Sequence, residues 1–202
     1  MSCVQGKEGA AMSHGITKTK IKDVFRQLVI ESSFAKVKVA DIIAKAGVSR
    51  MTFYRHYPDK YALLEELCFD DFNLFVQIYG RNATWKQVTM SILNVIRDNG
   101  VFYQKILEDK EAGPYLFLAQ HDISQQYTGK IAVQGTNTAW EGTICNWAKD
   151  GFRETAEEIY RTLVYNLPIR EVLPENELER AIQGYENKTM EEFMCQKEKH
   201  NS

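Results

Sequence analysis

The side chains best suited to contact another macromolecule lie in one short run, Ser49 to Tyr57, which reads Ser-Arg-Met-Thr-Phe-Tyr-Arg-His-Tyr. The guanidinium of Arg50 can donate two hydrogen bonds to guanine O6 and N7, and Met51 can make apolar contact with a thymine methyl. Short or rigid polar side chains such as Thr52 and Tyr54 can reach phosphate oxygens. The run therefore predicts contact with the major groove of double-stranded DNA.

The DNA-binding candidates extend on both sides of this run. They share a polar, cationic or aromatic side chain within or beside one motif, Lys38 to Tyr57: Lys38, Ser49, Arg50, Met51, Thr52, Tyr54, Arg55, His56, Tyr57 and Lys60. Tyr57, although part of the motif, can also point inward with Phe53 and Val48 onto the neighbouring helices. Lys60 can reach the DNA backbone from the flank.

Three helices must position these side chains. Ile21, Val24, Phe25, Leu28 and Val29 recur at helical spacing, which predicts an amphipathic helix from Thr17 to about Ser32. A second, short helix follows Lys38 and stops at Gly47, because glycine enters the left-handed region without steric cost. Ser49 can then cap a third helix that Pro58 ends. Two short helices around a tight turn are typical of a helix-turn-helix.

The distribution of charge favours the same interpretation. From Ser13 to Lys60 the chain has ten Lys/Arg and four Asp/Glu, a net charge of +6, whereas Tyr61 to Ser202 carries a net −8. A basic head on an acidic body is typical of a module that binds a polyanion. The pI of about 6.1 for the whole chain hides this division.

The stretch from Val39 to Leu64 resembles the N-terminal domain of the TetR/AcrR family of bacterial regulators. The resemblance spans about 45 residues, from Ile21 to Leu67, and depends on Ala46-Gly-Val-Ser, Thr52-Phe-Tyr, and Lys60 followed by Leu63-Leu64. It implies a three-helix DNA-binding head and a helical body that dimerises through its last two helices. It also implies repression of nearby genes from a near-palindromic operator, relieved when a small-molecule effector binds the body.

One departure leaves a second function open. The family usually places threonine at the N-cap of the second helix, where it binds a phosphate, and this chain has Lys38 there. A lysine cannot accept hydrogen bonds from the helix amides, which removes roughly 1 kcal/mol of capping. The alternative is a TetR-like co-regulator that binds another protein and has little DNA affinity.

The body is all-α in the same way, because no alternation of period two appears. Aromatic and histidine side chains at helical spacing are candidates to line a ligand cavity: Phe102, Tyr103, Tyr115, Phe117, His121 and Trp140. Gly129 to Thr138 is aperiodic and is predicted to be a loop before a helix from Ala139. The last two helices are similar to the Firmicutes-type TetR C-terminal domain, which implies a homodimer interface near Ile144, Trp147, Ile159, Leu163 and Val164.

The predicted organisation is a disordered leader (1–13), a helix-turn-helix domain (14–60), a ligand-binding and dimerisation domain (61–173) and a polar tail (174–202) that can form a helix. Four dispersed cysteines favour reduced thiols in the cytoplasm. We expect no membrane span, metal or cofactor, and no pattern supports an enzyme. The carboxylate pairs Glu65-Glu66 and Asp70-Asp71 point about 100° apart on a helix, which favours a solvated face over an acid/base site.

Overall fold

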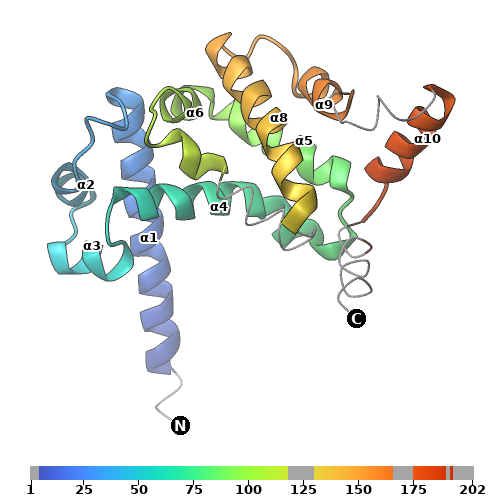
Figure 1. Ribbon diagram of the computed structural model, residues 1–202. Helices are drawn as coiled ribbons and strands as arrows, with labels where there is room; N and C mark the ends of the chain where they lie inside the picture. The colour runs from blue at the N-terminus through green and yellow to red at the C-terminus, as the bar shows by residue number, and fades with distance from the viewer. Residues whose placement is uncertain (1–4, 118–129, 166–174, 190–191, 193–202) are drawn as a thin grey trace.

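The computed structural model describes residues 5–117, 130–165, 175–189 and 192, and their helices confirm the predicted all-α fold (Figure 1). The helices are α1 (Gln5–Glu31), α2 (Val39–Ala46), α3 (Arg50–His56), α4 (Lys60–Tyr79), α5 (Trp85–Asp98), α6 (Gly100–Leu107), α8 (Lys130–Lys149), α9 (Ala156–Tyr165) and α10 (Glu175–Glu186). A 3₁₀ turn, Gly80–Asn82, follows α4, and residues 113–117 are also helical. Within these described segments, no helix is both long and apolar enough to cross a bilayer.

The head consists of α1, α2, α3 and the start of α4, and each helix turns apolar side chains inward. The buried side chains of α1 to α3 include Ile21, Phe25, Val29, Ile42, Ala46 and Phe53. Gly47 ends α2 with a φ of 62°, in the left-handed region, and the N–H of Val48 returns to the carbonyl of Ile43 at 3.3 Å. Ser49 Oγ accepts the N–H of Thr52 at 3.0 Å. The predicted turn and cap are therefore confirmed.

Helix α4 passes from the head into the body, and its carboxylates pair with the basic side chains of α1 (Figure 1). The pairs are Lys18–Glu66 (2.8 Å), Lys22–Glu66 (2.6 Å), Lys22–Asp70, and Arg26–Asp71 (2.8 Å). The prediction of a solvated carboxylate face is therefore wrong for Glu66 and Asp71. Part of the positive charge of the head is used within the protein, so fewer cations remain for a polyanion.

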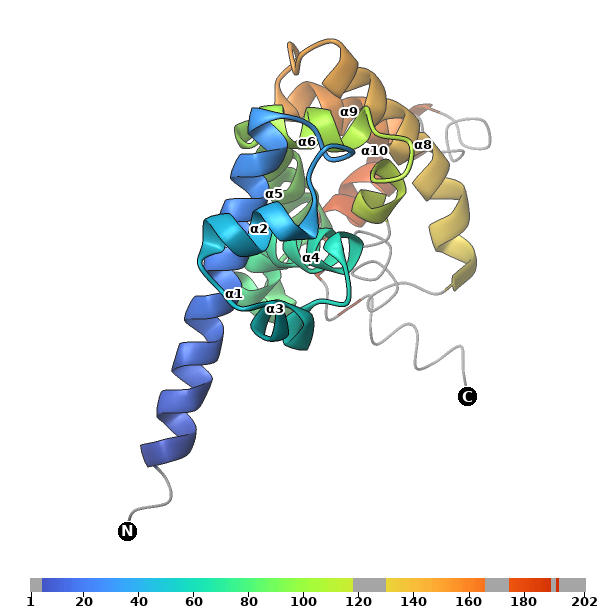
Figure 2. The same cartoon turned by 90° about the vertical axis from the view of Figure 1, so that its left-hand side faces the viewer.

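Two predicted boundaries are wrong. Helix α1 begins at Gln5, so residues 5–13 are helical where a disordered leader is predicted (Figure 2). Helix α8 begins at Lys130, so the predicted loop from Gly129 to Thr138 is helical from Lys130 on. Both stretches lack proline, and each continues a helix that packs elsewhere. Once such a nucleus exists, each added residue gains a hydrogen bond at low cost, even without an apolar stripe.

The body packs α5 against α4 and α9, and α8 against α6 and α9 (Figures 1 and 2). The turn between α8 and α9 passes through Gly151, with a φ of 73°. Trp147 is buried there, and its Nε1–H donates to the carbonyl of Glu154 at 3.0 Å. Helix α10 occupies part of the predicted polar tail.

Candidate nucleic-acid interface

Helix α3 has one buried face and one exposed face. Phe53 is fully buried, whereas Met51 and Tyr54 are 80% and 53% exposed. Arg50 and Arg55 are also exposed. The ring of Tyr54 meets the buried ring of Phe53 edge to face at 5.5 Å, which limits its freedom. The four exposed side chains therefore form a cationic and aromatic surface, supported by the buried ring of Phe53. We call this surface the α3 face (Arg50, Met51, Tyr54 and Arg55).

The start of α3 carries two linked hydroxyl groups. Ser49 Oγ and Thr52 Oγ1 lie 2.9 Å apart, while Ser49 Oγ also accepts the Thr52 N–H. Only one hydroxyl hydrogen is needed between the two oxygens, so the other can be donated outward. This pair extends the polar edge of the α3 face.

The side chain of Lys38 is exposed and does not cap α2, but Asp41 in the first turn of the helix supplies part of the missing capping interaction. Asp41 Oδ2 accepts the backbone N–H of Lys38 at 3.2 Å, which is one half of a capping box. The N-terminus of α2 is therefore ordered, and the ammonium group of Lys38 is on the surface. Nearby, Lys45 differs because it pairs with Glu31 at 2.9 Å.

The predicted contact through Tyr57 is wrong, because its side chain is only 1% exposed. Its hydroxyl donates to Glu66 Oε1 at 3.2 Å, and burial raises the pKa of this phenol. Tyr57 is thus part of the core that supports α3, which is the inward alternative noted for it. His56 is half-buried, and its ring lies 6.1 Å from that of Tyr57. Both ring nitrogens are buried from solvent, so the predicted DNA contact through His56 is also wrong.

Lys60 contacts the protein backbone. Its Nζ donates to the carbonyls of Phe34 at 2.8 Å and Val37 at 3.2 Å, and it lies 4.2 Å from the centre of the Phe34 ring. Burial lowers the pKa of this ammonium group. Two of its three N–H donors are used, so any phosphate contact depends on the third.

Comparison with known proteins agrees with this geometry. Residues 21–67 match the family described as bacterial regulatory proteins, tetR family. The N-terminal domain belongs to the TetR family. That match contains the helix-turn-helix and the Lys22–Glu66 pair between α1 and α4, and the family is regulatory rather than enzymatic.

Similarity to TetR-family proteins also extends beyond the head. The HTH-type dhaKLM operon transcriptional activator DhaS of Lactococcus lactis is 27% identical over 105 residues, which are 52% of this chain and 56% of that protein. The chain therefore spans about half the length of this curated relative.

Two solved structures share the fold. A TetR transcriptional regulator from Streptococcus agalactiae 2603V is 24% identical, with a TM-score of 0.57, over 78% of this chain and 96% of that one. The dihydroxyacetone kinase operon activator DhaS is 19% identical, with a TM-score of 0.52, over 85% and 98% of the two chains. The likeness thus includes the body as well as the TetR-family head.

Two predicted ligand contacts pack between the head and the body instead. Phe102 and Tyr103 are fully buried, with the Arg26 guanidinium 4.8 Å from the Phe102 ring centre. The Tyr103 hydroxyl donates to Asp71 Oδ2 at 2.5 Å. Tyr115 is half-buried and lies 5.1 Å from the ring of Tyr61. These three aromatic side chains pack against other residues of the same chain.

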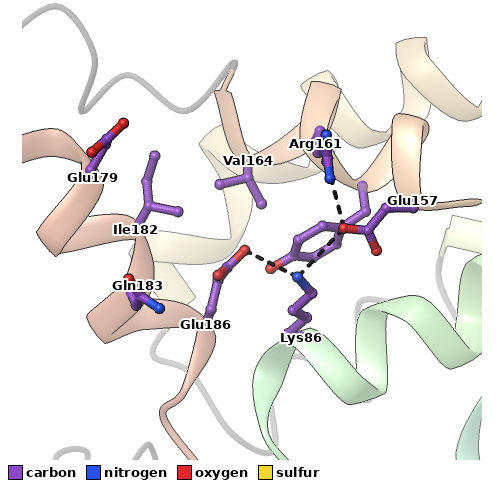
Figure 3. Close-up of a pocket in the computed structure, with 9 residues that line it drawn as sticks. Lys86, Glu157, Arg161, Val164, Glu179, Ile182, Gln183 and Glu186 are labelled. Atoms are coloured by element: carbon purple, nitrogen blue, oxygen red, sulfur yellow. Dashed lines mark ion pairs between the residues drawn. The ribbon is translucent and has the colours of Figure 1, made fainter. Parts of the chain in front are cut away.

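In the described part of the chain, a polar cavity of about 290 Å³ lies between α5 and α9 of the body and α10 of the predicted tail (Figure 3). It is lined by Lys86, Glu157, Tyr160, Arg161, Val164, Glu179, Ile182, Gln183 and Glu186. Lys86 lies between Glu157 at 3.5 Å and Glu186 at 3.8 Å. Of the predicted ligand residues, Phe102, Tyr103, Tyr115, Phe117 and Trp140 are absent from this lining, and His121 lies outside the described residues. Helical spacing identified buried aromatics, but it cannot distinguish a cavity wall from a filled core.

The predicted dimer contacts are also buried within the single chain. Ile144, Trp147, Ile159, Leu163 and Val164 are 1–6% exposed. Little of their surface is left for direct contact with a second copy, and an interface near these side chains stays a prediction. Their apolar stripe attaches α8 and α9 to the body. Any interface on these helices would use outward residues such as Asn146 and Thr162, which are exposed.

Proposed function

We propose that this protein is a DNA-binding transcriptional regulator whose α3 face enters the major groove. The observation that carries the proposal is the division of α3, in which Phe53 is fully buried while Arg50, Met51, Tyr54 and Arg55 are exposed. The groove, about 12 Å wide, admits one helix whose first residues face the base edges. An exposed cationic helix disfavours the alternative of a co-regulator without DNA affinity.

The proposed roles follow the position of each side chain. Arg50 and Met51, in the first turn of α3, read bases. Phosphate contacts come from the surrounding polar groups: Lys38, Ser49, Thr52, Tyr54, Arg55 and the third donor of Lys60. Lys38 is the N-cap residue of α2, and Ser49 is the N-cap residue of α3.

The body, residues 61–173, supplies dimerisation in this proposal, and it binds the effector together with α10 of the tail. Two heads of a homodimer would place their recognition helices about 34 Å apart on a near-palindromic operator. An effector that binds more tightly when the two heads are not spaced to fit the operator would release the DNA. The free energy available for release is the difference between the effector's binding free energies for the two states. The cavity beside Lys86 and Glu186 is the candidate effector site among the described residues, and its charges favour a polar ligand.

The direction of regulation follows from where the operator lies relative to a promoter. The family resemblance favours repression, whereas the curated relative DhaS is named an activator. A reporter gene behind the selected operator decides between them.

Selection of bound duplexes from a random DNA pool, followed by mobility shift, tests the proposal. We expect enrichment of a near-palindrome, and weaker, less selective binding by Arg50→Ala. Lys110→Ala is the matched control, because Lys110 is an exposed lysine of the body. No enrichment, together with no salt-dependent binding and a stable complex with another protein, would favour the co-regulator.

A further inference from the structure

The connection between α1 and α2, residues 32–38, is held by two lysines from outside it. Helix α1 ends at Glu31, and the last carbonyls of a helix lack partners within it. Lys105 Nζ donates to the carbonyls of Ile30 at 2.7 Å and Ser32 at 2.9 Å. Lys60 donates to those of Phe34 and Val37. Two ammonium groups thus satisfy four carbonyls within eight residues.

The two lysines come from different parts of the protein. Lys60 is the first residue of α4, beside the recognition helix, whereas Lys105 is in the last turn of α6, within the body. Helix α6 also packs on α1 (Figure 2). Lys105 therefore links the body directly to the backbone that leads into α2.

We propose that Lys105 is a positioning residue for DNA binding, which acts from the body without touching DNA. This inference rests on the proposed DNA-binding function. The backbone that Lys105 holds leads directly to Lys38, the first residue of the motif, and then to α2. Helix α2 in turn is joined to α3 through the Gly47 turn, so displacement of the connection displaces both DNA-contacting elements.

The dependence of binding on salt separates positioning from phosphate contact. Each phosphate neutralised by a lysine contributes about −0.9 to the slope of log K against log salt. A lysine that positions the backbone contributes affinity without releasing counterions from DNA. Removal of the Lys105 ammonium should therefore weaken binding at every salt concentration and leave the slope unchanged.

The test uses full-length wild type, Lys105→Met, Lys105→Arg and Lys110→Met, titrated by fluorescence anisotropy with a duplex chosen by the selection above. Methionine keeps most of the apolar stem and removes the donors, whereas arginine retains donors for both carbonyls. We expect Lys105→Met to bind about tenfold more weakly with the wild-type slope. Lys105→Arg should recover most of the affinity, and Lys110→Met should match wild type.

Hydrogen exchange provides a second readout that needs no DNA. In Lys105→Met, amides of residues 39–46 should exchange faster, while those of α9 stay unchanged. The proposal is overturned by wild-type affinity in Lys105→Met, by a slope that flattens by about 0.9, or by unchanged exchange in α2. Failure of the wild type to bind any duplex would overturn the proposed function instead, and the exchange result would still show whether Lys105 positions α2.

Discussion

The ion pair between Arg26 and Asp71 should be one of the strongest polar contacts between head and body. Arg26 donates two hydrogen bonds to the carboxylate, at 2.8 and 2.9 Å, and a third to Asn99 Oδ1 at 3.2 Å. Burial alone would lower the pKa of the Arg26 guanidinium, but the charge of Asp71 reverses this, so the pKa lies above its ordinary value. Tyr103 completes the group through its hydroxyl.

The contribution of the Arg26–Asp71 pair to the free energy of unfolding can be bounded from the exposed fractions of the two side chains. The two side chains are 23% and 21% exposed, between a surface pair and a buried one. Surface pairs contribute about 0–1 kcal/mol, and loss of one partner of a buried pair costs about 3–5 kcal/mol. We expect Arg26→Met to lower the free energy of unfolding by about 2–3 kcal/mol, because Asp71 is left without its cation.

A double-mutant cycle with Asp71→Asn measures the interaction itself. Urea unfolding at one fixed protein concentration gives the free energy for each variant. The double variant should cost at least about 1 kcal/mol less than the two single changes together. Lys20→Met is the control, since Lys20 is exposed on the same helix and should change stability little. Additive costs, within about 0.5 kcal/mol, would refute the coupling.

Three other predictions address the recognition surface and its support. In mobility shift, Arg50→Ala should lose about 1–3 kcal/mol of discrimination at one base pair, and equal loss on all sequences would contradict base reading. Lys60→Ala should lower the free energy of unfolding by about 2 kcal/mol, because two carbonyls lose a charged donor; an equal effect of Lys36→Ala, an exposed lysine of the same connection, would contradict this. The hydrogen bond from Tyr61 to Glu111 raises the pKa of Tyr61 from 10.0 to about 12. The unfolded chain then loses this proton first, so stability falls as pH rises from 10 to 12, and Tyr61→Phe should reduce that fall in urea unfolding. The tyrosinate absorbance that disappears in Tyr61→Phe should titrate near pH 12, and titration near pH 10 would contradict the contact.

Local patterns in the head were sufficient to predict its helices, although not the start of α1 at Gln5. Apolar spacing from Ile21 to Val29, a glycine at the turn and a serine cap each depend on a few neighbouring residues, and the structure retains all three. The exposed side chains of α3 followed from the same spacing, because the position of Phe53 determines which residues face away from the core.

Contacts between segments that are distant in the sequence could not be predicted from local patterns. Nothing near Lys105 in the chain indicates that it meets Ile30, and nothing near Asp71 indicates Arg26. The aromatics of the body showed the limit most clearly. Tyr103 has helical spacing whether it lines a cavity or fills the junction with the head, and only the neighbouring helices decide which.

Protection of Met51 from oxidation tests most directly whether the α3 face lies against DNA. Met51 is 80% exposed, so dilute peroxide should oxidise it readily in the free protein, whereas Met90 of α5 is half-buried and serves as the internal reference. Oxidation of each is followed by mass spectrometry of the peptides, at low conversion, with and without saturating operator duplex. We predict that DNA slows oxidation of Met51 several-fold and leaves Met90 unchanged. Equal oxidation of Met51 in the bound and free protein would contradict the account.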